Sequence, residues 1–295
     1  MRFMMMVKSD AKSEAGVLPD AKDLAEMGKF NDELVKAGAM LAGEGLQASG
    51  KGTRIRYGAG KYRVIDGPFA ETKELVAGFW LISAKSKAEA IDWAKRAPIQ
   101  DGEVEIRPLY ELEDFPVDPA EQPEGRRDQE QKFRDNAPAQ TARKPGDKRI
   151  RYMGLLKADA YTEAGSPPNE KILAEMGALM DDMAKAGVLL SGEGLKPSSE
   201  GARVHYAGSK RTVIDGPFTE TKELIAGYSI FQVKSKEEAI EWSKRFIKIH
   251  VDGVGAAEGE SELRQLFELE DFPVDASEKP DGWRHQEQSF RERQS

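Results

Sequence analysis

Cysteine is absent from this chain of 295 residues. Its absence excludes disulfides, thiolate metal sites, iron–sulfur clusters and cysteine nucleophiles. Long hydrophobic runs are missing as well, because no stretch approaches the roughly 18 consecutive apolar residues that a membrane span needs. The apolar start Met1–Val7 reaches Lys8 too soon for the hydrophobic core of a signal peptide. We therefore expect a cytoplasmic protein with no membrane partner.

Basic residues are the minority among the charges. Lys and Arg number 44 and Asp and Glu number 52, so the formal net charge is −8. Because affinity for nucleic acid depends on Lys and Arg meeting phosphates, we expect no nucleic-acid partner. His205, His250 and His285 are the three histidines, and none has a metal-ligand spacing such as His-Glu-x-x-His. Gly43 and Gly45 lack the third glycine and the following helix of a dinucleotide fingerprint. We expect neither a metal nor a cofactor.

The chain contains one unit twice. Arg2–Arg96 aligns without a gap with Arg151–Arg245 at an offset of 149, and 51 of the 95 positions are identical. After Arg96 the offset becomes 157, so the second copy has about eight extra residues near Lys248–Gly259, a segment that contains His250. Two copies are too few for a solenoid and predict a fused dimer, in which one chain supplies both halves of a two-fold assembly. A higher oligomer of such chains stays open.

The repeat divides the chain into four segments. The first module spans residues 1–117 and the second spans residues 150–274. A charged tail and linker occupy residues 118–149, and a second charged tail occupies residues 275–295. Each tail carries a phenylalanine, Phe133 or Phe290, which favours docking of the tail on the folded modules.

Hydrophobic periodicity predicts the same order of elements in both copies: strand, helix, strand, hairpin, strand, helix, strand. The first helix ends at Gly38 or Gly187, because glycine accepts the left-handed backbone of a helix end. The second helix begins after Ser86 or Ser235, each an N-cap with Glu three residues later. The order is the split βαβ pattern of ferredoxin-like modules, so the predicted fold class is α+β.

Burial extends this prediction to the packing of the modules. A four-stranded sheet with both helices on one face leaves its other face bare. We expect the two bare faces to pack against each other as an intrachain pseudo-dimer, since burial of apolar surface favours that closure. The expected strands of the first copy are Arg2–Val7, Ala39–Ala42, Thr53–Tyr57, Tyr62–Ile65, Leu75–Ala84 and Val104–Tyr110.

One segment of each copy resembles a known family. Asp66–Glu74 begins with Asp-Gly-Pro-Phe and is similar to the DGPF group of the YCII-related family. Gly43–Leu46, Ala88–Trp93 and Glu105–Pro108 fit the same family pattern in order, and the resemblance covers about 110 residues of each copy. It implies ferredoxin-like modules of the dimeric α/β-barrel superfamily. It implies little about activity, because most members have none assigned.

The resemblance does not supply a catalytic pair. Some members of the family resemble lyases or dehydrohalogenating enzymes, and their chemistry is attributed to a His on the first helix and an Asp after the second strand. Here the first helix has no His in either copy, and Leu46–Gly52 and Leu195–Gly201 contain no Asp. That dyad therefore cannot be transferred to this chain.

Asp66 and Asp215 are candidate catalytic residues. Each ends a strand and enters a Gly-Pro turn. The structural interpretation is an Asx-turn, in which the carboxylate accepts backbone N–H bonds. In the functional interpretation both carboxylates project into the barrel as acid–base residues or ligand anchors.

Charged residues at equivalent positions of the two copies are candidate ligand-binding residues. One interpretation is a pocket for an anionic small molecule, because Arg grips a carboxylate or phosphate with two hydrogen bonds. The other is an internal network, because Arg is costly to bury unpaired. Glu105, Glu111, Glu262 and Glu268 are available partners. The candidates are Glu44, Arg54, Lys73, Glu74 and Arg107 in the first copy and Glu193, Arg203, Lys222, Glu223 and Arg264 in the second.

Three functions stay open at this point. The first is a small-molecule-binding or regulatory module with a polar pocket in each half. The second is a lyase or isomerase in which Asp66 and Asp215 act as bases on an anionic substrate. The third is a protein-interaction partner of a transcription regulator, which the family context favours.

Overall fold

The computed structural model describes residues 1–114, 147–166 and 168–272, which we call the first half (1–114) and the second half (147–272). The charged tails, with the predicted docking of Phe133 and Phe290, lie outside the described residues. The first half contains β1 (Arg2–Lys8), α1 (Ala11–Glu14), α2 (Ala21–Lys36), β2 (Met40–Gly45), β3 (Thr53–Gly58), β4 (Lys61–Asp66), β5 (Val76–Ser83), α3 (Lys87–Arg96) and β6 (Asp101–Pro108). The second half contains β7 (Ile150–Lys157), α5 (Ala160–Glu163), α6 (Glu170–Lys185), β8 (Leu189–Gly194), β9 (Ala202–Ala207), β10 (Lys210–Asp215), β11 (Ile225–Val233), α7 (Lys236–Val254) and β12 (Glu258–Gln265).

The predicted order of elements is confirmed, and so are the predicted helix ends. Gly38 and Gly187 follow α2 and α6 with φ of +67° and +66°. Ser86 caps α3 and Ser235 caps α7, each accepting the backbone N–H of the Glu three residues later at 3.3 Å. The additional residues of the second copy lengthen a helix: α7 has 19 residues where its counterpart α3 has 10.

The hairpins are exchanged between the halves. The strand order is β10-β9-β6-β1-β5-β2 in one sheet and β4-β3-β12-β7-β11-β8 in the other. The first-half hairpin β3–β4 thus pairs with β12, and the second-half hairpin β9–β10 pairs with β6. The four-stranded sheet that the sequence predicts for each half is extended to six antiparallel strands by two strands of the other half. The exchange ties the halves together through backbone hydrogen bonds.

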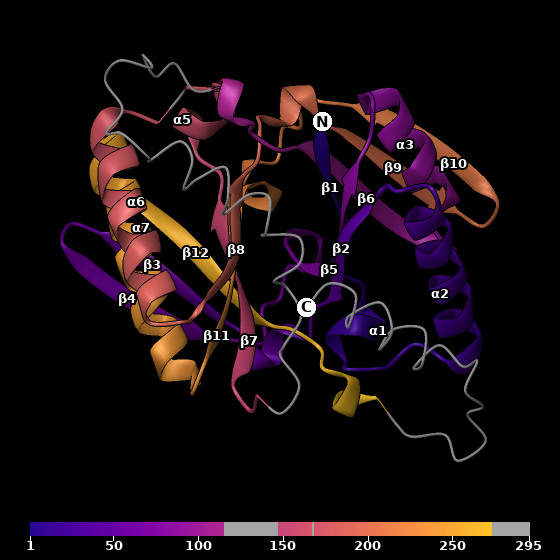
Figure 1. Cartoon of the computed structure of the whole chain (residues 1–295), viewed down its shortest axis with the longest axis horizontal. Helices are drawn as coiled ribbons and strands as arrows, with labels where there is room; N and C mark the ends of the chain where they lie inside the picture. Colours follow the sequence, from indigo (N-terminus) through magenta and orange to yellow (C-terminus); the bar gives the residue numbers. More distant parts are fainter. Residues whose placement is uncertain (115–146, 167, 273–295) are drawn as a thin grey trace.

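The two sheets form the middle of the molecule, with α2 and α3 outside one sheet and α6 and α7 outside the other (Figure 1). A buried cluster between the sheets combines Met4 and Phe79 of the first half with Met153 and Tyr228 of the second. A shared apolar cluster of this kind is consistent with the predicted packing of two bare sheet faces. Two further clusters lie under the helices, and the one beneath α2 and α3 includes Tyr206 from the exchanged hairpin.

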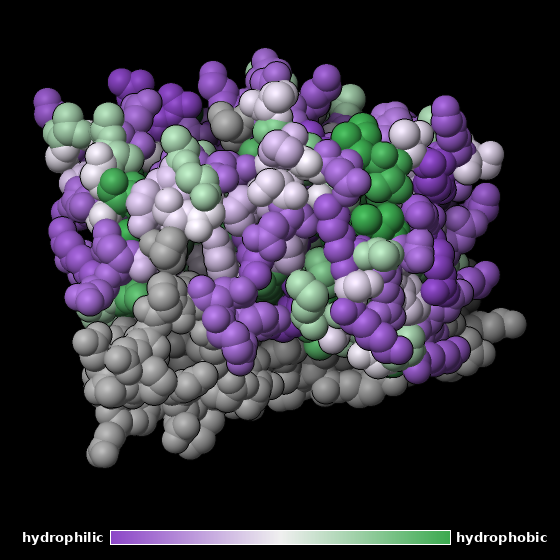
Figure 2. All heavy atoms as spheres, turned by 90° about the horizontal axis from the view of Figure 1, so that it is seen from above, coloured by the Kyte–Doolittle hydropathy of each residue, from purple (hydrophilic) through white to green (hydrophobic). Residues whose placement is uncertain are grey.

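The outer surface is dominated by charged and polar residues. Figure 2 shows one face on which hydrophobic residues gather in small separate groups among hydrophilic ones. Large exposed hydrophobic side chains among the described residues are Met1, Val17, Tyr62, Val64 and Ile214. No helix in the described part of the chain combines the length and apolar character needed to cross a membrane.

Candidate functional site

Charged side chains form two equivalent buried networks where each exchanged hairpin meets the other half. In the first network, the Glu105 carboxylate on β6 forms ion pairs with Arg107 Nη1 at 3.1 Å and with Arg203 Nη2 at 2.9 Å. Lys8 Nζ lies 3.3 Å from the same carboxylate. Glu105 and Arg107 are fully buried, and Arg203 comes from the exchanged hairpin. The network therefore links the exchanged hairpin to the other half.

The second network repeats the first with the halves reversed. The Glu262 carboxylate on β12 forms ion pairs with Arg264 Nη1 at 3.3 Å and Arg54 Nε at 2.8 Å. Lys157 Nζ lies 3.8 Å from the same carboxylate. Glu74 and Glu223 complete the two networks, at 3.0 Å from Arg54 and 3.1 Å from Arg203.

A further pair of ion pairs crosses between the halves. Glu44 accepts Arg151 Nη1 at 2.6 Å, and Glu193 accepts Arg2 Nη1 at 2.6 Å. Sequence reasoning named both glutamates and missed both arginines. The available signal was their equivalent place at the start of the first strand of each copy, where an otherwise apolar run begins with Arg.

These contacts support the internal-network interpretation of the candidate ligand-binding residues. Arg54, Arg107, Arg203 and Arg264 already hold carboxylates. Lys73 and Lys222 do not belong to these networks, and both residues are exposed. An anion would have to compete with the carboxylates for these arginines, so the networks are better suited to holding the fold than to binding a substrate.

The first network makes stability depend on pH. Burial opposes the charged form of Glu105, but Lys8, Arg107 and Arg203 outweigh it and lower its pKa from 4.5 to about 2. A carboxylate with a depressed pKa in the folded state contributes stability above its unfolded pKa and loses it as the pH falls toward the folded value. We expect the free energy of unfolding to fall between pH 4.5 and about 2.

Urea denaturation at a series of pH values tests this expectation. The same series on Glu105→Gln supplies the control, because the amide does not titrate. A variant with the full acid dependence of the parent would contradict the assignment.

The structure places the two candidate catalytic carboxylates at the surface. The Asp66 side chain is 68% exposed and the Asp215 side chain 73%, so neither projects into the interior. Asp66 accepts Lys236 Nζ at 2.6 Å and Thr53 Oγ1 at 2.8 Å, and these hydrogen bonds lower its pKa. Asp215 lies 2.8 Å from Lys87 Nζ. Each carboxylate thus links an exchanged hairpin to a helix of the other half, and its catalytic role stays an untested prediction.

The turn after Asp66 has a steric reason for its glycine. A Cβ at Gly67 would lie 1.9 Å from the backbone oxygen of Ser49, and one at Gly216 would lie 1.8 Å from that of Ser198. Ser49 Oγ also accepts the backbone N–H of Phe69 at 3.0 Å. The Asp-Gly-Pro-Phe segment is therefore fitted closely against the loop before its own hairpin.

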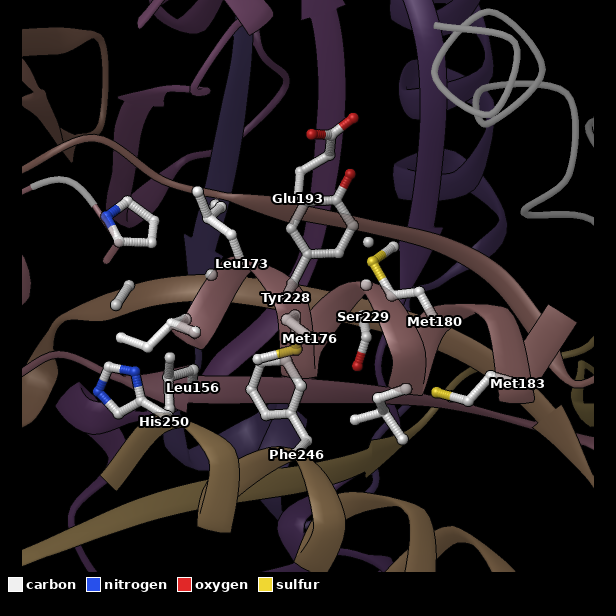
Figure 3. A pocket seen from close by; sticks show the side chains of 18 of the residues that line it. Leu156, Leu173, Met176, Met180, Met183, Glu193, Tyr228, Ser229, Phe246 and His250 are labelled. Atoms are coloured by element: carbon white, nitrogen blue, oxygen red, sulfur yellow. The ribbon is translucent and has the colours of Figure 1, made fainter. Parts of the chain in front are cut away.

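A cavity of about 690 Å³ is lined mainly by α6, α7, β8 and β11 of the second half, with Tyr110 of the first half at its wall. We call it the second-half pocket. Three methionines of α6 reach into it, and Glu193 and Tyr228 lie together at another part of its wall (Figure 3). Its described lining contains no Lys or Arg. Its lining includes Met176, Met180, Met183, Glu193, Tyr228, Ser229, Phe246 and His250.

The equivalent space in the first half is filled by an indole. Ser229 of the pocket corresponds to Trp80, which packs edge-on against Phe30 with ring centroids 5.3 Å apart. Trp80 Nε1 donates to Asn31 Oδ1 at 2.8 Å. A Cβ at Gly43 would lie 3.1 Å from Trp80, whereas the nearest atom to one at the equivalent Gly192 would be 3.5 Å away. At this position the first half is therefore filled where the second half has a cavity, and the predicted polar pocket in each half stays a prediction.

The additional turns of α7 complete the pocket. Phe246, His250 and Val254 line it, and His250 is only 6% exposed. His250 Nε2 lies 2.9 Å from Asp159 Oδ2, and hydrogen bonds from His250 and Thr162 outweigh burial and lower the pKa of Asp159 to about 2. Sequence reasoning located His250 in the additional segment but gave it no role. The combined signal was this insertion and the change from Trp80 to Ser229 in the same copy.

No group of three or more His, Asp and Glu side chains within residues 1–114, 147–166 and 168–272 is arranged to hold a metal ion. The residues that line the second-half pocket can instead hold an organic molecule by apolar contact, with hydrogen bonds from a few polar groups.

Comparison with known proteins identifies the family. The model of the YCII-related domain matches residues 1–113 and 150–250. A protein of Rhizobium meliloti (strain 1021), described as uncharacterized, is 36% identical over 93 residues, which cover 30% of this chain and 75% of that protein. Among solved structures, a mutant chlorite dismutase from Candidatus Nitrospira defluvii in complex with cyanide aligns over 92% of this chain and 91% of that chain, with 11% identity and a TM-score of 0.34. That likeness is too distant to assign an activity. The chain belongs to the YCII-related domain family, whose model matches it once in each half.

Proposed function

We propose that this protein binds a small, largely apolar molecule in the second-half pocket, while the first half serves as the scaffold that completes the fold. In this proposal the two halves form an intrachain version of a dimeric α/β barrel. The observation that carries the proposal is the exchange of Trp80 for Ser229 at equivalent positions. One half has a filled core, and the other has an open cavity at the same place.

The size and lining of the pocket support a small-molecule ligand. Ligand sites are commonly clefts of about 300–1,000 Å³ with mostly apolar walls and a few placed polar groups. The cavity has about 690 Å³ and is lined by methionine, aromatic and aliphatic side chains together with Ser229 and His250. Flexible methionine side chains adapt to ligands of irregular shape.

The charges of the lining favour an uncharged ligand. Asp181 belongs to the lining, and so does Glu193, whose carboxylate is paired with Arg2. Lys and Arg are absent from the described lining residues. A bound anion would lose its hydration without gaining a cationic partner. The sequence predicts an anionic small molecule as the ligand. This pocket is better suited to an uncharged molecule, and the arginines of the buried networks are already paired with carboxylates. The lyase or isomerase alternative also loses support, because its bases Asp66 and Asp215 are exposed outside this pocket.

Refilling the pocket tests the proposal. In Ser229→Trp, an indole occupies the space that it fills in the first half. We expect the affinity for the apolar probe 2-methoxynaphthalene, measured by equilibrium dialysis, to fall at least about tenfold, since the ring and the probe compete for one volume.

The matched control is Ser209→Trp, which places the same side chain in the exposed β9–β10 turn. Circular dichroism of both variants checks that the fold is kept. Unchanged probe affinity in a folded Ser229→Trp variant would refute the proposal.

A further inference from the structure

We infer that His250, oriented by Asp159, is the hydrogen-bond acceptor of the second-half pocket and selects an uncharged apolar ligand that carries a hydroxyl group. This inference rests on the proposed function and names the ligand class of that site. Its basis is a hydrogen-bonded pair of side chains, a buried histidine and a partly exposed aspartate, in the second half of the molecule. The first half has Asp10 where the second has Asp159, but it has no counterpart of His250.

The geometry assigns the proton on the imidazole. Asp159 is ionised at neutral pH because its pKa is about 2, and an ionised carboxylate accepts hydrogen bonds only. His250 Nε2, at 2.9 Å from Asp159 Oδ2, therefore carries the proton and donates it. When the ring is neutral, its other nitrogen, Nδ1, is an acceptor. It has no hydrogen-bond partner within the part of the chain that the structure describes.

The imidazole faces the pocket. His250 is nearly buried, and its ring is among the side chains that line the cavity, at one side of the view in Figure 3. Met180 and Met183 of α6 lie toward the other side of the view in Figure 3, and Met176 lies between them and His250. A ligand with its apolar body among the methionines and its hydroxyl toward His250 would satisfy both parts of the lining.

The surroundings hold this acceptor in place. Asp159 is the N-cap of α5 and also accepts the backbone N–H of Thr162 at 2.8 Å, so its carboxylate has a fixed position. In the last turn of α7, close to His250, Asn169 Nδ2 donates to the backbone oxygen of Gly253 at 2.8 Å. A Cβ at Gly253 would lie 2.2 Å from Ile172, so glycine permits this close approach of α7 to α6. The helix α7, which carries His250, is thus held against the start of α6.

The ligand class follows from these contacts. The acceptor requires a hydrogen-bond donor, which a hydroxyl group supplies. The apolar lining requires an apolar body, and the lack of Lys and Arg in the described lining disfavours an anion. A phenol or an apolar alcohol meets all three conditions. The ligand hydroxyl donates a hydrogen bond to His250 Nδ1 and keeps its proton, so the proposal concerns binding and no chemical reaction.

Two probes of the same skeleton test the inference. 2-Naphthol has a hydroxyl donor, and 2-methoxynaphthalene has a methoxy group in its place. We expect the parent protein to bind 2-naphthol about tenfold more tightly in equilibrium dialysis, the ratio that one good hydrogen bond supplies. His250→Phe keeps a ring of similar size but removes the acceptor, and we expect the ratio of the two dissociation constants to fall to about one.

Asp159 is a positioning residue, and Asp159→Asn tests it. Asparagine caps a helix about as well as aspartate, so α5 is retained. Its amide can donate to Nε2, which moves the proton to Nδ1 and removes the acceptor. We expect the preference for 2-naphthol to be lost while 2-methoxynaphthalene still binds. The controls are Asp10→Asn, the equivalent cap of the first half, and His205→Phe on the exposed side of β9.

The outcomes separate the two claims. If neither probe binds the parent protein, the proposed function fails. If both bind with equal affinity, or if His250→Phe keeps the preference, the inference fails and the apolar pocket stands. Loss of the preference in either control variant would also overturn the inference, because these residues lie outside the pocket.

Discussion

Glu105→Gln is expected to lower the free energy of unfolding by about 3–5 kcal/mol, the usual effect of removing one member of a buried ion network. Glu105 is fully buried and receives Lys8, Arg107 and Arg203. An amide keeps the shape of the side chain but leaves these three cations without their shared counter-charge. Since Arg203 belongs to the exchanged hairpin, the loss falls on the contact between the halves. Urea denaturation at neutral pH measures it.

Glu103→Gln is the matched control on the same strand. Its side chain is 25% exposed and lies 3.4 Å from Arg203, at the margin of the network. Such a contact contributes less than about 1 kcal/mol. If both variants lost the same free energy of unfolding, burial of the central carboxylate would not explain the contribution of the network to stability. A loss below about 1 kcal/mol for Glu105→Gln would contradict the role of the network itself.

The sequence predicted the local elements well because their signals are local. Helix caps at Ser86 and Ser235 and helix ends at Gly38 and Gly187 depend on residues within a few positions of each other. The exchange of hairpins does not have such a signal. The two candidate partner strands, β6 and β12, are copies of one another, and each offers a glutamate and an arginine to an arriving hairpin. Pattern alone cannot choose between two nearly equivalent partners.

The site was less predictable for a related reason. Asp66 is conspicuous in sequence because it stands in a distinctive turn, yet the turn places it at the surface. The change from Trp80 to Ser229 was visible in the alignment of the two copies. The strand that contains these residues is apolar at almost every position, so alternation could not tell which of them faces a helix. His250 and Asp159 are 91 residues apart and meet only through the packing of α7 on α5 and α6.

Trp80→Ser is expected to open a pocket in the first half and to destabilise the protein by about 3–5 kcal/mol, the range for replacing a large aromatic core residue by a small one. Trp80 is 5% exposed and loses both its ring contact with Phe30 and its hydrogen bond to Asn31. Trp80→Phe keeps most of the ring volume, and we expect a loss of about 1–2 kcal/mol. Urea denaturation compares the two variants.

Trp80→Ser also tests which residues make the pocket specific to the second half. If the indole alone keeps the first half closed, equilibrium dialysis should show a second equivalent of 2-methoxynaphthalene bound to Trp80→Ser, with the original site unchanged. The new site has no counterpart of His250, so it should take 2-naphthol and 2-methoxynaphthalene with similar affinity. A destabilised but folded variant that gains no second site would mean that α2 collapses into the space, and that the longer α7 is needed to keep a pocket open. Cavity formation and ligand selection would then both depend on the additional segment of the second half.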